Sequence, residues 1–211
     1  SRGHRRAPDP FLVVDAEGWA ADLRARFVIP DPAERRATIV QGLEAAAAAA
    51  GVVPSLPDAL LDEVCDLVEW PVVVAGTLPA ALLDLPPRLL VESMHVQQRI
   101  FDTRTPDGDL APVFLAVSNA PQGDPAVVSA GNARVLAARF QDARFFYDED
   151  RRKRLELHGE RLERMQWVRG LGTVAEKARR LGRLGALLAG DLGADAEVVA
   201  RAALLCKADL A

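Results

Sequence analysis

The chain has 211 residues, half of them hydrophobic, and a formal net charge of −4 at pH 7. This length suits one large domain or two small ones, with enough apolar residues for a core. The negative charge argues against a protein that coats nucleic acid non-specifically, so any RNA contact must come from a local basic patch.

The ends and the cysteines of the chain give further expectations. No apolar run reaches membrane-spanning length and no signal peptide opens the chain, so we expect a cytoplasmic protein. Cys65 and Cys206 match no metal-ligand spacing and are expected to be buried thiols. Because the chain begins with Ser1 and stops within a helical pattern, we expect a segment of a longer polypeptide.

The first 51 residues are expected to hold two short strands and two helices. The short elements are a strand at Phe11–Val14, a helix within 15–27 and a strand at 27–30. Asp31 followed by Pro32 is a typical start of a longer helix, since aspartate caps helices and proline favours their first position. A run of alanines favours continuation of that helix up to Gly51.

A second helix and a strand are predicted over residues 57–76. The helix spans 57–70 and is broken by Pro71. Its apolar stripe comprises Leu60, Leu61, Val64, Leu67 and Val68. The apolar run 72–76 then predicts a buried strand.

A helix, a turn and the clearest strand of the chain follow. The helix lies within 85–101 and begins near Pro87, Asp107-Gly108 predicts a hairpin turn, and 111–120 predicts the strand. The expected sheet core is Trp70, Val72, Val74, Phe114 and Leu115.

After Asp124 the sequence reads as helix to the end, with breaks near Gly159, Gly170–Gly172 and Gly193. Thr173 and Glu176 have the spacing of a helix-capping box. We therefore expect an α+β fold, in which a domain with a small mixed sheet (residues 1–124) precedes a mainly helical region (residues 125–211).

Residues 131–156 mix arginines, aromatics and acids. Leu136, Phe140 and Tyr147 share one helical stripe. Residues 148–150 are acids and each has a base four positions later, an arrangement that stabilises a helix by roughly 0.2–0.5 kcal/mol per pair. Two interpretations stay open: a solvated helix whose charges pair with each other, or bases that reach phosphate.

Motifs for catalysis are not found. The histidines, His4, His95 and His158, have no second ligand at metal-binding spacing and no following aspartate. The sequence contains no G-x-S-x-G motif and no phosphate-binding P-loop, and Gly170-x-Gly172 follows no predicted strand. We therefore predict no catalytic, cofactor-binding or metal-binding residue in this chain.

Seven segments, in order, resemble the β subunit of the bacterial heterotetrameric glycyl-tRNA synthetase. They cover nearly the whole chain and comprise "RGHR", "LLDEVCDLVEWPVVVAG", "LPPRLLVESMHVQQRIF", "DGDLAPVFLAVSN", "GNARVLAARFQDARFFYDEDRRKRLE", "LGTVAEKARRL" and "RAALLCKADL". The chain departs from the family pattern at Asp102, where the family has proline, at Ala137, and in "WVRGLGT". Each segment alone is weak evidence, but seven in register are specific.

The resemblance implies a segment of the glycine–tRNA ligase β subunit, which binds tRNA and supports a partner α subunit. That subunit would carry the catalytic site and use ATP and Mg²⁺; glycine tRNA would be the other partner, and neither DNA nor a membrane is expected. Residues 125–211 would begin a helical, His-Asp-type domain that is truncated at its C-terminus. The implied tRNA contacts are Arg151, Arg152, Lys153, Arg154, Arg134, Gln98 and Arg99. The alternative is a stand-alone, non-catalytic paralogue that acts as a protein-interaction module.

Overall fold

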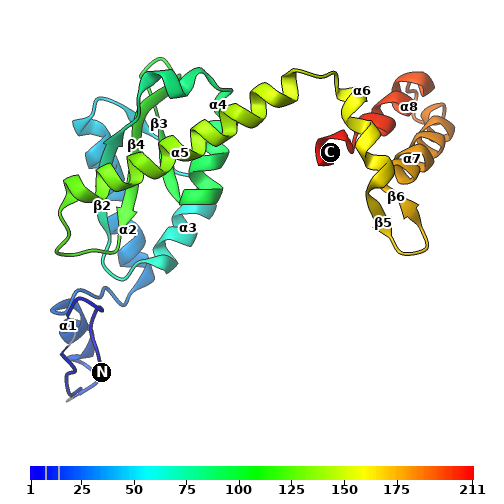
Figure 1. Ribbon diagram of the computed structural model, residues 1–211. Coiled ribbons are helices and arrows are strands. Elements are labelled where there is room, and N and C mark those ends of the chain that lie inside the picture. The colour runs from blue at the N-terminus through cyan, green and yellow to red at the C-terminus, as the bar shows by residue number, and fades with distance from the viewer. Residues whose placement is uncertain (8, 14) are drawn as a thin grey trace. The chain divides into compact units, whose positions relative to one another are not determined.

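The computed structural model describes residues 1–7, 9–13 and 15–211. The chain forms two compact units, Ser1–Arg144 and Phe145–Ala211, and the boundary falls within the long helix α5 (Pro125–Arg151). Figure 1 shows both units, and we describe each by itself. The domain boundary predicted between residues 124 and 125 stays a prediction.

The first unit is built on a four-stranded antiparallel sheet. Its strands are β1 (Val53–Pro54), β2 (Val72–Thr77), β3 (Ile100–Arg104) and β4 (Leu110–Ser118), in the order β1-β3-β4-β2. The predicted turn joins β3 to β4, and Gly108 there has a φ of +95°, which glycine adopts without strain. The sheet and its helices confirm the predicted α+β class.

Helices cover both faces of this sheet. The cluster on one face joins α2 (Pro32–Ala49) and α3 (Asp58–Leu67) to the strands through Leu43, Leu61 and Leu115. Side chains alternate along a strand, so Phe114 faces the opposite side, which α5 crosses in Figure 1. Val74, Phe114 and Leu115 are buried as predicted, whereas Trp70 and Val72 are only half-buried.

The start of α2 confirms the expected capping. The Asp31 carboxylate accepts a hydrogen bond from the Ala33 N–H at 2.8 Å, with Pro32 in the first turn. Between β2 and β3 lie η1 (Ala80–Asp84) and α4 (Pro87–Glu92), and α4 continues into a π-helical turn, η2 (Ser93–Gln98). That turn ends at Arg99, whose φ of +53° is unusual for a residue other than glycine.

The second unit is a small helical bundle with a hairpin. Its elements are α6 (Leu155–His158), η3 (Gly159–Arg164), β5 (Gln166–Val168), β6 (Gly172–Thr173), α7 (Val174–Ala189), α8 (Ala196–Leu205) and η4 (Ala208–Leu210). Its core includes Leu162, Val174 and Ala175. Both hydrogen bonds of the predicted Thr173–Glu176 capping box are present. The sequence predicted a break in helix near Gly170–Gly172, but it did not predict the β5–β6 hairpin that the structure has there.

Two predicted strands near the N-terminus are not formed in the described residues. Residues 11–13 are irregular, and Val14, the end of that predicted strand, lies outside the described part. Residues 27–30 follow the short helix α1 (Trp19–Arg24), but Phe27 has a φ of +60°, which is incompatible with a strand. The Phe27 and Val28 N–H groups donate back to the end of α1, and the Ile29 N–H donates to the Glu69 carbonyl at 2.9 Å.

Two side chains predicted to be buried are exposed. Helix α3 ends at Leu67, three residues earlier than expected, and Leu67 is 61% exposed. Val68 lies beyond the helix in an extended conformation, but its side chain is buried in the same core as Leu61 and Val64. Cys65 is buried as expected, but Cys206 is exposed. No helix of the described residues is both long enough and apolar enough to cross a membrane.

Candidate nucleic-acid interface

Four consecutive bases, the basic cluster Arg151–Arg154, lie where α5 gives way to α6. Helix α5 ends at Arg151, and α6 begins at Leu155, so the chain turns within the cluster. All four side chains are exposed. The cluster therefore lies on a connecting turn and not along one face of a helix.

This turn changes the ion pairs that the sequence predicts. Pairs four residues apart require a continuous helix, and α5 stops before residues 152–154. Among the described residues the acids at 148 and 150 form no ion pair with the cluster. Arg152 pairs instead with Glu149, one turn back, and Arg154 lies 3.4 Å from Glu156. The predicted pairing was wrong because α5 ends at Arg151, before the three bases that would complete the pairs.

The cluster is only partly neutralised. Glu156 is shared between Arg154 and Arg201, the latter at 2.7 Å. A hydrogen bond from the Glu156 backbone, then the Arg154 guanidinium, holds the pKa of the Glu156 carboxyl below its usual range. Within the described chain Arg151 and Lys153 have no ion-pair partner, and the Arg151 guanidinium lies 5.4 Å from the centre of the Tyr147 ring. Two cations thus stay available to an external anion.

Exposed aromatic rings lie beside these cations. Phe145 and Phe146 are 60% and 63% exposed, and their rings meet edge to face with centres 5.5 Å apart. Phe146 also lines a pocket of about 660 Å³, in which Arg151 and Lys153 are accompanied by two acids, Asp150 and Asp209. Sites for single-stranded nucleic acid combine such cations with aromatic faces on which bases stack. The arrangement suits a phosphate backbone with nearby unpaired bases.

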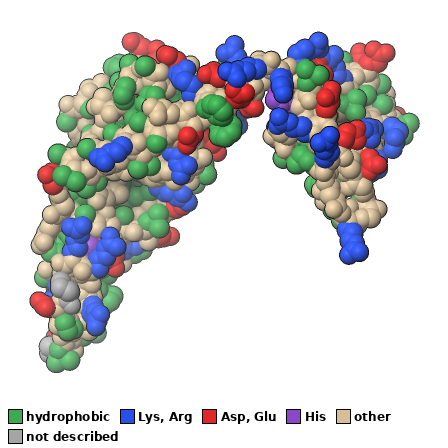
Figure 2. Space-filling model, in the orientation of Figure 1, with side chains coloured by type: hydrophobic (Ala, Val, Ile, Leu, Met, Phe, Trp, Pro, Cys, Tyr) green, Lys and Arg blue, Asp and Glu red, His purple; other side chains and the backbone are tan. Residues whose placement is uncertain are grey.

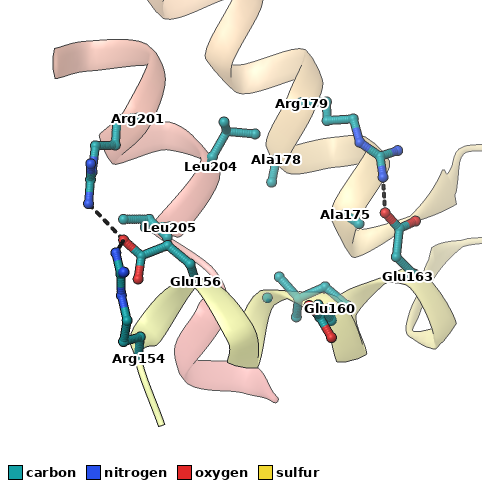
Figure 3. Close-up of a pocket in the computed structure, with 12 residues that line it drawn as sticks. Arg154, Glu156, Glu160, Glu163, Ala175, Ala178, Arg179, Arg201, Leu204 and Leu205 are labelled. Atoms are coloured by element: carbon teal, nitrogen blue, oxygen red, sulfur yellow. Dashed lines mark hydrogen bonds and ion pairs between the residues drawn. The ribbon is translucent and has the colours of Figure 1, made fainter. Parts of the chain in front are cut away.

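A second pocket of the same unit, shown in Figure 3, is charge-balanced. It measures about 550 Å³ and its polar lining consists of Arg154, Arg179, Arg201, Glu156, Glu160 and Glu163. Arg179 is ion-paired with Glu163, as the close-up shows, and the inner wall is apolar. Three cations facing three carboxylates leave little net attraction for an anion. All three of its arginines are ion-paired, whereas Arg151 and Lys153 of the pocket beside Phe146 have no such partner in the described chain, so the charge-balanced pocket is the weaker candidate for phosphate.

The other three candidates belong to the sheet unit. Gln98 and Arg99, at the end of η2, line a pocket of about 410 Å³. The Arg99 Nε donates to a Glu63 carboxylate oxygen at 2.7 Å, so this cation is partly neutralised. Arg134 on α5 is exposed and does not line that pocket. The seven candidates thus form a group of four on one unit and a group of three on the other.

Sequence reasoning did not identify two amides that line the same pocket as Gln98. Asn119 follows the end of β4 and Asn132 lies on α5. A polar residue directly after a predicted strand was an available signal for Asn119. Asn132 carried no such signal, because a single polar residue in a helix is most often solvated.

The described residues contain no group of three or more His, Cys, Asp or Glu side chains placed to hold a metal ion. Figure 2 shows basic and acidic side chains interspersed over the face in view of each unit. This mixture agrees with the net charge of −4. A nucleic-acid contact on this protein must therefore be local.

Comparison with known proteins gives a consistent match over the whole chain. The profile of a family described as "Glycyl-tRNA synthetase beta subunit" matches residues 1–211. The glycine–tRNA ligase beta subunit of Rhodospirillum centenum is 43% identical over 215 residues, which cover 100% of this chain and 30% of that protein. Those of Phenylobacterium zucineum and Pseudomonas syringae pv. tomato are 44% and 39% identical, with 100% of this chain and 32% and 31% of the relatives covered. The chain spans about a third of the length of these relatives.

Proposed function

Because this chain belongs to the family of glycyl-tRNA synthetase beta subunits, we propose that it contributes tRNA binding and scaffolding to a glycine–tRNA ligase. In this proposal a partner α subunit forms glycyl-tRNA and uses ATP and Mg²⁺. The chain itself supplies no catalytic residue and binds no cofactor. The complex would act in the cytoplasm.

The observation that carries the tRNA-binding role is the exposed basic cluster beside Phe145 and Phe146. Arg151 and Lys153 are free of carboxylate partners within the described residues, and the neighbouring rings offer faces for stacking. Cations of this kind neutralise phosphates and release counterions, which favours binding. The nearby acids lower the local positive charge. We therefore propose that the cluster assists binding and does not read sequence.

The test is tRNA binding by the α/β complex across a range of salt concentrations. The variant Arg151→Ala, Arg152→Ala, Lys153→Ala removes three cations of the cluster, among them the two without an ion-pair partner in the described chain. The expected result is weaker binding, with the slope of log affinity against log salt falling by about 0.7–0.9 for each phosphate that the variant no longer neutralises. A matched control, Arg88→Ala, Arg139→Ala, Arg183→Ala, removes the same charge at exposed positions outside the cluster.

The control separates a local contact from a general change in charge. Equal losses in both triple variants would contradict a specific role for the cluster. Unchanged affinity and slope in the cluster variant, with its fold intact, would remove the cluster from the tRNA interface. Circular dichroism of each variant checks the fold.

One observation favours the second candidate, a protein-interaction module without tRNA function. Leucines in and directly after α7 are strongly exposed, with Leu187 and Leu192 each 78% exposed and Leu184 54% exposed. Exposed apolar groups of this kind mark surfaces that other proteins cover. If the chain is such a stand-alone module, it adds no affinity for tRNA to the α subunit. Titration of tRNA against the α subunit with and without this chain distinguishes the two functions.

A further inference from the structure

The pocket of about 410 Å³ on the sheet unit, here called the amide pocket, is built from separate segments of the chain, and α3 lines it with Val64 and Leu67. The end of η2 contributes Gln98 and Arg99, the end of β4 contributes Ser118 and Asn119, and α5 contributes Asn132. Its volume exceeds that of a nucleobase. The sheet and two helices hold its walls, so its shape is set by the fold of the unit.

The floor of the amide pocket is apolar. Val68, Ile100 and Ala116 line it and are all at least nine-tenths buried. None of the residues that line the pocket is an acid, and Arg99, its one basic lining residue, is paired with Glu63 outside it. A neutral, flat ligand with a polar edge fits this lining better than a free ion does.

Two of the amide side chains are oriented by hydrogen bonds that use only one of their two polar groups, either the oxygen or the NH₂. The Asn119 Oδ1 accepts from the Glu69 and Trp70 N–H groups, both at 3.1 Å, which leaves its NH₂ without a partner in the described chain. The Asn132 Nδ2 donates to the Val128 carbonyl at 3.0 Å, which leaves its Oδ1 as an acceptor. The pocket therefore presents a positioned donor and a positioned acceptor, beside the Gln98 amide.

The backbone that carries Gln98 and Arg99 is strained. The π-helical turn η2 ends at Arg99 in the left-handed region, at a φ of +53°. The Arg99 side chain is fixed by its bonds to Glu63 and to the Val96 carbonyl. Strain and π-helical turns occur preferentially at binding sites, where the surrounding structure maintains an unfavourable geometry. Here that geometry places Gln98 at the amide pocket.

We propose that the amide pocket binds a single unpaired nucleobase of the RNA, an inference that rests on the proposed tRNA-binding function. A nucleobase has apolar faces for the floor and a mixed donor and acceptor edge for Asn119, Asn132 and Gln98. Unpaired bases expose their edges, and proteins read RNA mainly at such bases. In this proposal the pocket contacts a base, whereas the basic cluster contacts phosphates.

The test compares a short single-stranded RNA of mixed sequence with the same sugar-phosphate backbone lacking bases, each binding to the whole protein. Two variants alter the amide pocket, Gln98→Ala and Asn132→Leu. Gln97→Ala and Gln141→Ala are matched controls, because both glutamines are exposed and neither lines the pocket. Asn119 is left unchanged, since it also binds the backbone of Glu69 and Trp70.

We expect each pocket variant to weaken binding of the mixed RNA about two- to tenfold, the effect of removing one hydrogen bond. The salt slope stays unchanged, because no charge is removed. The control variants bind like the parent, and the backbone without bases binds weakly and equally to all five proteins.

Three results would overturn the inference. The first is unchanged affinity in both pocket variants while the cluster variant shows a lower affinity and a lower slope, which leaves the proposed function intact. The second is equal binding of RNA with and without bases, which would show that the pocket binds no base and would favour a protein ligand instead. The third is no binding of any RNA, tRNA included, by the protein or its complex, which removes the proposed function as well.

Discussion

The Nε2 atom of His95 lies 2.8 Å from Oδ1 of Asp102, inside the sheet unit. Asp102 is on β3 and its side chain is completely buried, whereas His95 is on the π-helical turn η2. The Arg104 guanidinium lies 3.1 Å from the other carboxylate oxygen, as an ion pair without hydrogen-bond geometry. The buried carboxylate thus joins η2 to the sheet.

These contacts predict how the stability of the protein depends on pH. Burial, the largest single influence, raises the pKa of Asp102, but the His95 hydrogen bond and the attraction of His95 and Arg104 together lower it below its usual range. A lowered pKa means that the ionised form stabilises the fold above the unfolded pKa of about 3.9, and that this stability is lost as pH falls through the lower, folded pKa. The pH window of this loss therefore lies below about pH 4.

The variant Asp102→Asn tests this contribution. We expect it to cost about 1–3 kcal/mol of unfolding free energy near neutral pH, because a charged hydrogen-bond acceptor is replaced by a neutral one. As pH falls below about 4 the difference from the parent protein shrinks, and it disappears once pH is below the lowered folded pKa, where Asp102 is protonated in both states. Urea unfolding over a pH series measures it. A difference that is constant with pH would contradict the ionised form of Asp102 in the fold.

A second prediction concerns the contact between Gly76 and Phe114. The two residues are directly paired between β2 and β4, and a methyl group at Gly76 would overlap the Phe114 ring. Gly76→Ala should therefore cost about 1–3 kcal/mol through overpacking, and Phe114→Ala about 3–5 kcal/mol through the cavity left behind. Gly131→Ala is the control, because that helical position has open space and alanine favours helices.

The double variant Gly76→Ala, Phe114→Leu makes this prediction sharper. A smaller side chain at position 114 relieves the overlap. The double variant should therefore lose less unfolding free energy than Gly76→Ala and Phe114→Leu lose when their separate losses are added. Additive costs in urea unfolding would show that the ring and the added methyl do not meet. A Phe114→Ala cost under about 1 kcal/mol would contradict burial of the ring.

A third prediction concerns the start of α7. Thr173 accepts from the Glu176 N–H at 3.2 Å, and the Glu176 carboxylate accepts from the Thr173 N–H at 2.9 Å. Thr173→Ala should cost about 0.5–2 kcal/mol because the Glu176 N–H at the helix start loses its side-chain acceptor. Amide hydrogen exchange in α7 measures the change. Thr173→Ser keeps the oxygen and should stay close to the parent, and equal protection in all three proteins would contradict the role of the cap.

A fourth prediction concerns activity. We expect the purified chain alone to catalyse neither glycine-dependent ATP–pyrophosphate exchange nor ATP hydrolysis, because its sequence contains no nucleotide-binding or nucleophile motif. Addition of the α subunit is the positive control and should restore exchange. Exchange activity that co-purifies with this chain through several columns, without an α subunit, would contradict the assignment of catalysis to the partner.

Local signals in the sequence were sufficient for several elements. Asp31 with Pro32, and Thr173 with Glu176, act through bonds within three residues, so the starts of α2 and α7 could be predicted without the tertiary structure. The apolar run that forms β4 and the turn at Gly108 could likewise be predicted from neighbouring residues alone. The burial of Leu136 and Phe140 on α5 followed from helical periodicity.

Other features depend on residues that the sequence places far apart. Asn119 binds the backbone N–H groups of Glu69 and Trp70, which follow the end of α3, about fifty residues earlier. The charges of residues 148–154 have the spacing of a longer helix, yet α5 ends at Arg151. Such endings depend on where a chain must turn to pack the next element, which a charge pattern does not encode.

The amide pocket and the buried pair of His95 and Asp102 also could not be predicted from the sequence, because they depend on how separate segments pack. Nothing in the spacing of Gln98, Asn119 and Asn132 relates them, and only the folded sheet unit brings η2, β4 and α5 to one pocket. A buried aspartate is stable only if the fold supplies its partners, and here a π-helical turn and a strand supply them. The sequence by itself determined where α2 and α7 begin and where β2 and β4 run, because those signals are local. The tertiary structure decided where helices end and which polar groups meet, because both are set by packing between distant segments.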